Sequence, residues 1–113
     1  MRKAAIFILL VFLLLSSPLA AEQVGRQEYS VLTRAYQYLA KEQYQESLDL
    51  LQPLLEKRNP SSYAFSYGSL CYGALHEFGK ARALLTRAVQ IHPEQSGLWC
   101  NLGNYQMHLN DFI

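Results

Sequence analysis

The chain has 113 residues, and half of them are hydrophobic. This is enough for one small folded domain and is not typical of a disordered chain. The formal net charge is +1; without the basic pair Arg2 and Lys3 the count becomes 8 basic against 9 acidic residues, or −1. The sequence has no basic stripe, so nucleic-acid binding is not expected.

Residues 1–21 have the three parts of a secretory signal peptide. A basic start at Arg2 and Lys3 precedes an unbroken apolar run over residues 4–15, and small residues follow over residues 16–21. The sequence therefore predicts an exported protein, periplasmic in a bacterium and secreted otherwise.

The predicted cleavage follows Ala20 or Ala21, with residues 22–27 as a linker to the rest of the chain. The alternative is an uncleaved membrane anchor. A membrane-spanning helix needs about 20 apolar residues, whereas this run has 12 and is followed by Pro18. We expect contact with a membrane only through the transient signal peptide.

From Glu28 onward the sequence has a period of 34 residues. Its blocks cover residues 28–61, 62–95 and 96–113, and the third contains only a first helix and a turn. The eighth and twentieth places of a block are small and the seventeenth is aromatic. The small residues are Ala35, Ser69 and Gly103 at the eighth place and Ser47 and Ala81 at the twentieth. The aromatic residues at the seventeenth place are Tyr44, Phe78 and Phe112. Such a period predicts stacked pairs of antiparallel helices, whose small residues allow close approach.

Three segments resemble the tetratricopeptide repeat family. The first helix and turn of a repeat resemble residues 99–105 together with Asn110-Asp111-Phe112, in block three. The same family pattern is matched by Phe78-Gly79-Lys80-Ala81 in block two and by Tyr44-Gln45-Glu46-Ser47 in block one. The resemblance covers residues 28–113. It implies an all-α fold, with antiparallel helix pairs stacked as a short right-handed solenoid of about two and a half repeats.

The chain departs from the family pattern at several places. In the family, the seventh place of a repeat is usually a large aliphatic residue, but here it is Arg34 in block one and Gly68 in block two. A one-residue insertion in block two would instead align Tyr67-Gly68 with the Leu-Gly position of the family pattern. Gly68 and Gly73 each cost about 1 kcal/mol relative to Ala within a helix, so this helix is expected to be the least stable. Pro53 predicts a kink in the second helix of block one.

No pattern of catalytic residues, phosphate-binding loop or cofactor site is present, and no small-molecule substrate is expected. His76, His92 and His108 are too far apart to share a metal ion. Cys71 and Cys100 are expected as free thiols; a disulfide is the alternative, although their places in adjacent first helices differ by about 7.5 Å along the axis.

The family resemblance implies a concave groove lined by the first helices of the blocks. We expect the partner-binding residues to be Tyr29, Leu32, Tyr36, Tyr63, Ser66, Leu70, Asn104 and Met107. Gly73 is also placed on this lining. Chaperone-binding members of the family clamp a carboxylate with Lys, Arg and Asn, of which only Asn104 is present. The lining instead favours an apolar or aromatic segment of another protein, although leucines of this spacing also occur in cores.

The sequence therefore predicts a non-catalytic interaction scaffold of the cell envelope. The alternative is the N-terminal interaction part of a longer exported enzyme or assembly factor that is truncated at residue 113. Self-association through the uncapped helix of block three is a further possibility.

Overall fold

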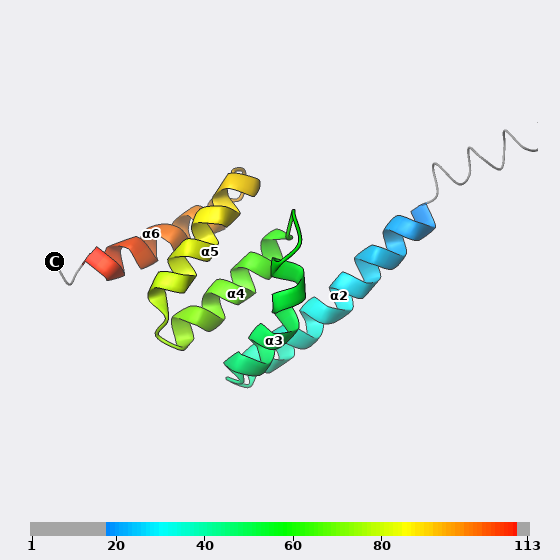
Figure 1. Cartoon of the computed structure of the whole chain (residues 1–113), viewed down its shortest axis with the longest axis horizontal. Coiled ribbons are helices and arrows are strands. Elements are labelled where there is room, and N and C mark those ends of the chain that lie inside the picture. The colour runs from blue at the N-terminus through cyan, green and yellow to red at the C-terminus, as the bar shows by residue number, and fades with distance from the viewer. Residues whose placement is uncertain (1–17, 111–113) are drawn as a thin grey trace, which may run out of the picture.

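The computed structural model describes the backbone of residues 18–110 and the side chains of residues 25–109. Most of the predicted signal peptide and the turn of block three, including Phe112, lie outside this part. The described chain is all-helical, which confirms the predicted fold class. Its helices are α2 (Pro18–Ala40), α3 (Tyr44–Leu55), α4 (Ser62–Ala74), α5 (Phe78–Ile91) and α6 (Ser96–Asn110) (Figure 1).

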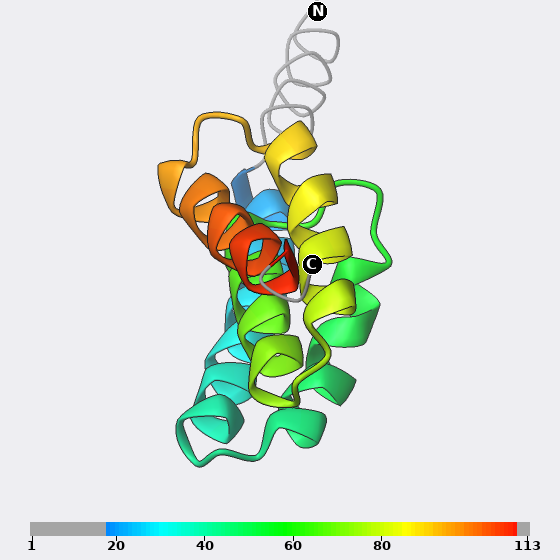
Figure 2. The same ribbon diagram turned by 90° about the vertical axis from the view of Figure 1, so that its left-hand side faces the viewer.

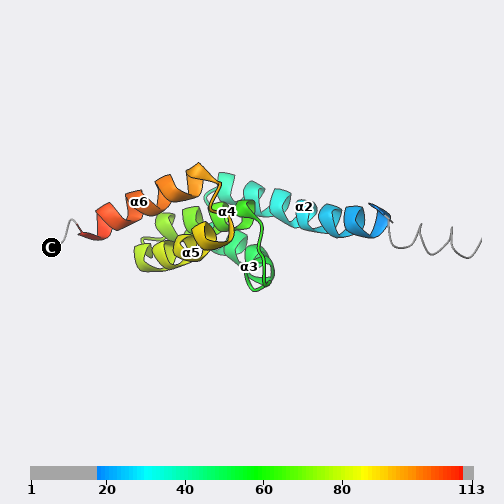
Figure 3. The ribbon, with the colours of Figure 1, turned by 90° about the horizontal axis from the view of Figure 1, so that it is seen from above.

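The helices pack as neighbours in pairs, α2 with α3 and α4 with α5, and α6 packs against α5. The first helices α2, α4 and α6 lie on one side of the molecule and α3 and α5 on the other (Figure 3). The turns within pairs lie at one end, and the loops between pairs lie at the opposite end (Figure 2). The first helices α2 and α4 are therefore adjacent, and they also contact each other directly.

Residues 22–27, predicted as a linker to the first block, are helical and continuous with the rest of α2. The segment contains no proline, and its single glycine, Gly25, would meet nothing within 4 Å if it carried a Cβ. Nothing in the local sequence therefore ends the helix between Pro18 and the first block.

The turns within the two pairs have the same backbone geometry. Glu42 and His76 have left-handed φ values of 61° and 62°. The following amides, of Gln43 and Glu77, donate to carbonyls five residues back, at 2.9 Å and 2.8 Å. These equivalent positions are 34 residues apart, so the period of the sequence is also a period of the backbone.

Small residues lie where the helices of each pair cross. In the first pair Ala35 and Ser47 are fully buried, and the Ser47 hydroxyl donates to the Ala35 carbonyl at 2.7 Å. Ser69 and Ala81 are fully buried in the second pair. Gly103 lies on α6, where a Cβ would meet nothing within 4 Å. The small residues of the first two pairs thus allow close approach, as predicted.

The core runs continuously through the blocks because every helix contributes to it. Leu51, Phe65, Leu85 and Leu98 are its largest hydrophobic members, exposed by no more than 2%. Each comes from a different helix, so the apolar stripe of one pair is covered by its neighbour. This is the arrangement by which stacked repeats gain stability.

The glycines of α4 admit neighbouring side chains. A Cβ at Gly68 would lie 2.9 Å from Leu84 Cδ2 and 3.1 Å from Leu55 Cδ1. At Gly73 it would collide with the ring of Tyr105. The low helix propensity of glycine is therefore offset by close packing of α3, α5 and α6 against α4.

Helix α3 contains Pro53 and ends two residues later, at Leu55. The Arg87 guanidinium donates to the carbonyls of Leu55 at 2.7 Å and Lys57 at 2.8 Å. It also lies 5.6 Å from the centroid of the Phe65 ring. A side chain of α5 therefore satisfies carbonyls that the end of α3 leaves without a helical partner.

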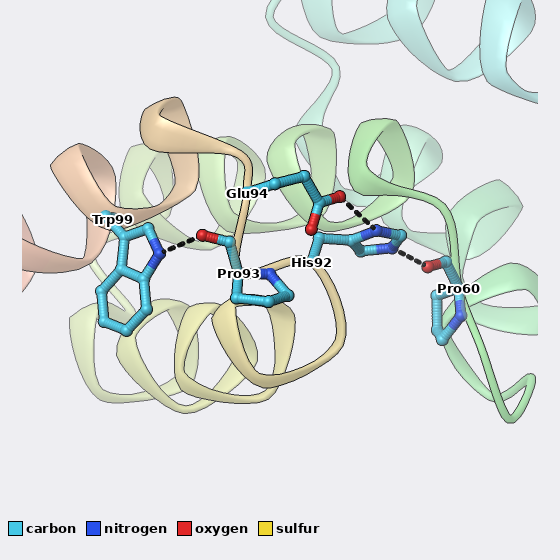
Figure 4. A network of polar contacts seen from close by, with 5 residues as sticks. All are labelled: Pro60, His92, Pro93, Glu94 and Trp99. Carbon is cyan, nitrogen blue, oxygen red and sulfur yellow. Dashed lines mark hydrogen bonds and ion pairs between the residues drawn. The ribbon is translucent and has the colours of Figure 1, made fainter.

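A second set of polar contacts joins the loops between the pairs (Figure 4). His92 Nε2 lies 2.7 Å from the Pro60 carbonyl. Because a carbonyl only accepts, this nitrogen carries the proton. His92 Nδ1 lies 3.7 Å from a Glu94 carboxylate oxygen, and the Trp99 indole donates to the Pro93 carbonyl at 2.9 Å. The two loops that contain Pro60 and Pro93 are thus tied together.

Candidate functional site

A hollow of about 550 Å³ lies between α2 and α4. We call it the tyrosine hollow, because four of its six lining residues are tyrosines. The lining residues are Tyr29, Leu32, Thr33, Tyr36, Tyr63 and Tyr67. The structure therefore brings together four of the residues predicted to bind a partner: Tyr29, Leu32 and Tyr36 from α2 and Tyr63 from α4.

Helical periodicity explains why these tyrosines share one face. Tyr29 and Tyr36 are seven residues apart, or about two turns, and Tyr63 and Tyr67 are about one turn apart. Three of them are largely exposed, with fractions of 72% for Tyr29, 52% for Tyr36 and 62% for Tyr63. Large aromatic side chains gathered at this exposure are typical of an interaction surface.

Tyr67 was missed by the sequence analysis as a member of the site. It packs against the core and also lines the tyrosine hollow. Its ring centroid lies 5.6 Å from that of Tyr36 and 6.4 Å from that of Tyr63, both at an interplanar angle of 45°. Its spacing of four residues from Tyr63 was the available signal, since such residues lie on one helix face.

Among the side chains that the structure describes, none that lines the tyrosine hollow is charged. Burial raises the pKa of the Tyr67 hydroxyl above its ordinary value, and the neighbouring Tyr36, Tyr63 and Tyr29 raise it further. This hydroxyl is therefore neutral at physiological pH and can donate a hydrogen bond.

The hydroxyls of the tyrosine hollow differ in whether they already make a hydrogen bond within the protein. Thr33 Oγ1 donates to the Tyr29 carbonyl at 2.8 Å, within its own helix. Within the part of the chain that the structure describes, none of the four tyrosine hydroxyls makes an intramolecular hydrogen bond. The hollow thus combines apolar ring surface with several donors that are open to a ligand.

The other predicted partner-binding residues do not join this hollow. Leu70 and Asn104 line a second hollow of about 300 Å³ between α4, α5 and α6, together with Phe78, Asn101, Tyr105 and His108. Ser66 and Met107 line neither hollow. The Ser66 carbonyl accepts the Ser69 hydroxyl at 3.0 Å, and Met107 is 67% exposed. The residues predicted to line the groove are therefore found in two hollows and, for Ser66 and Met107, outside both.

Tyr105 covers part of the predicted groove lining. Its hydroxyl donates to the Ser69 carbonyl at 3.2 Å, and its ring lies against Gly73. Gly73 was expected to line the open groove, but here it is covered by a side chain of α6. Phe78 and His108 extend the same aromatic cluster, with ring centroids 4.3 Å apart.

The remaining reactive side chains form no shared centre. Cys71 is buried, Cys100 is exposed, and both are free thiols. Burial raises the pKa of the Cys71 thiol above its ordinary value, and a hydrogen bond with Ser47 partly opposes this shift. Among the described residues, no three His, Cys, Asp or Glu side chains are arranged to hold a metal ion.

Within residues 18–110, no helix combines the length and the apolar character needed to cross a bilayer. No protein-family model matches the chain, and no curated protein or solved structure shows significant similarity to it. The resemblance to tetratricopeptide repeats therefore depends on the residues of this chain and on the repeated geometry of its helix pairs.

Proposed function

We propose that this protein is an exported, non-catalytic adaptor of the tetratricopeptide repeat type that binds an apolar or aromatic segment of another protein. The observation that carries the proposal is the tyrosine hollow. Tyr29, Tyr36 and Tyr63 are more than half exposed, although each offers a large apolar surface. Tyrosines of this kind are enriched at the centres of protein interfaces.

The repeated helix pairs support the same proposal. They hold the tyrosines of α2 and α4 on adjacent rigid helices, so little side-chain or loop ordering is needed on binding. The lining is neutral. A partner would therefore be recognised by shape and hydrogen bonding rather than by charge.

Selection of short random peptides displayed on phage against the full chain would test this function. We expect enriched peptides to contain aromatic and aliphatic residues and few charges. Replacing Tyr36 and Tyr63 together by Ala should weaken their capture by at least about tenfold, because hot-spot tyrosines contribute this much. Circular dichroism should show unchanged helicity, since both side chains are largely exposed.

The matched control is the double variant Tyr38→Ala and Tyr72→Ala. It removes two tyrosines from the same helices, α2 and α4, but neither lines the tyrosine hollow. Capture should be retained in this variant. Equal loss in both double variants, or a selection without enrichment, would contradict the proposed function.

A further inference from the structure

We infer that the tyrosine hollow binds a proline-rich segment in the polyproline II conformation. This inference rests on the proposed function and specifies the chemistry of the partner. Peptides are recognised in three main ways: by addition to a sheet edge, as a helix in a groove, or as a polyproline II helix on an aromatic surface. The contacts of the tyrosine hollow distinguish between them.

Addition to a sheet edge does not apply to this surface. The described residues form helices and turns only, and α2 and α4 provide both walls of the hollow. The backbone groups of a helix are bonded within the helix, so they cannot form a ladder with an extended peptide. Any hydrogen bonds to a partner must come from side chains.

The tyrosine hydroxyls favour a partner with free carbonyl groups. Four of them line the hollow, and no protein group within the described chain pairs with them. A bound helix would present carbonyls that already accept bonds within the helix. A polyproline II segment has no internal hydrogen bonds, and each of its carbonyls is open to a donor.

The scarcity of strong hydrogen-bond acceptors in the tyrosine hollow leads to the same conclusion. Within residues 25–109, no carboxylate and no side-chain amide lines this hollow. An ordinary extended peptide would bring one N–H donor per residue into this surface, whereas proline brings none. A proline-rich segment therefore matches a surface that is rich in donors and poor in strong acceptors.

The spacing of the rings fits the repeat of such a segment. Tyr29 and Tyr36 are seven residues apart on α2, which corresponds to about 10.5 Å along the helix axis. One turn of polyproline II, three residues, rises about 9.3 Å. Prolines three residues apart would thus meet successive rings. The rings of Tyr36 and Tyr63 each lie at 45° to the ring of Tyr67, with centroids 5.6 Å and 6.4 Å away, so the three rings form one aromatic surface on which a proline ring can pack.

Titration of the full chain, carrying isotope-labelled tyrosine rings, with a blocked oligoproline peptide would test the inference by NMR. We expect the ring signals of Tyr29, Tyr36, Tyr63 and Tyr67 to shift together. A blocked Ala/Leu helical peptide of equal length should shift them much less. Tyr36→Phe and Tyr63→Phe keep the ring and remove the hydroxyl, so each should raise the Kd for oligoproline by about threefold to tenfold.

The matched controls are Tyr38→Phe and Tyr72→Phe, which should leave the Kd unchanged. Tighter binding of the helical peptide, no ring shifts with oligoproline, or self-association that competes for the same rings would each overturn the inference. A Kd for oligoproline that does not change when the hydroxyls of Tyr36 and Tyr63 are both removed would also overturn the inference. If random peptides without proline are captured through Tyr36 and Tyr63, this inference fails while the proposed function stands.

Discussion

The ring of Tyr105 on α6 occupies the space that a Cβ at Gly73 of α4 would need. A Cβ built on Gly73 would lie 2.9 Å from Tyr105 Cζ, and the Tyr105 hydroxyl donates to the Ser69 carbonyl at 3.2 Å. This contact joins the first helices of the second and third blocks. Tyr105 also lines the second hollow, beside α6.

Gly73→Ala should therefore destabilise the protein although alanine is the better helix former. Alanine gains about 1 kcal/mol in propensity, but Tyr105 must leave its place, with a loss of packing and of a hydrogen bond. We expect a net loss of about 1 kcal/mol in the free energy of unfolding, measured by urea titration. Gly79→Ala in α5, where a Cβ meets nothing within 4 Å, is the control and should be neutral or stabilising. A Gly73→Ala protein more stable than the wild type would refute the packing argument.

Ser47→Ala should lower the free energy of unfolding by about 1 kcal/mol. Its hydroxyl donates to the Ala35 carbonyl across the α2–α3 crossing, where both residues are fully buried. Ser69→Ala is the matched control, because Ser69 is equally buried but its hydroxyl bonds only to Ser66 within the same helix. Such local bonds contribute little to helix stability. Equal losses in the free energy of unfolding for the two variants would show that the hydrogen bond between helices stabilises the protein no more than the local one.

Glu42→Gly should stabilise the turn between α2 and α3. Glu42 has φ of 61°, a conformation that costs an ordinary residue roughly 1–2 kcal/mol and glycine very little. After the entropy cost of glycine, we expect a rise of up to about 1 kcal/mol in the free energy of unfolding. Lys41→Gly, one position earlier, lacks this benefit and should be destabilising. Thermal unfolding of the two variants would compare them; a lower Tm for Glu42→Gly would be inconsistent with the geometry.

The protein should lose stability in alkaline solution. Burial raises the pKa of Cys71 above 9.0 and those of Tyr67 and Tyr105 above 10.0. The unfolded chain therefore loses these protons first, so the free energy of unfolding is unaffected below about pH 9 and falls as the pH rises further. Urea titrations between pH 8 and pH 11 would measure this. Cys71→Ala and Tyr105→Phe should each reduce the slope. A stability independent of pH in this window would contradict the burial of these groups.

Much of the fold follows from local patterns. The helix starts at Ser62 and Ser96 coincide with the first residues of the second and third blocks. The small residues Ala35, Ser47, Ser69 and Ala81 lie at the crossings because each helix repeats its face every three to four residues. The helical conformation of residues 22–27 is consistent with their sequence, which contains no local signal for the end of a helix.

The site was less predictable than the fold. The places in the repeat identified Tyr29, Leu32, Tyr36 and Tyr63, which do line one hollow. They did not identify Tyr67, and they joined Leu70 and Asn104 to the same surface. Which exposed residues share a hollow depends on how side chains from different helices pack, as the ring of Tyr105 on α6 packs against Gly73 on α4.

The sequence by itself determined the helix pairs, their period and the small residues at their crossings, because these depend on contacts that recur within one block. Only the tertiary structure decided that the predicted lining residues fall into two hollows, that Tyr105 packs against Gly73, and that four tyrosines line one hollow. These features depend on how neighbouring blocks pack. That packing is set by side-chain volumes from helices distant in the sequence, and no local pattern contains them.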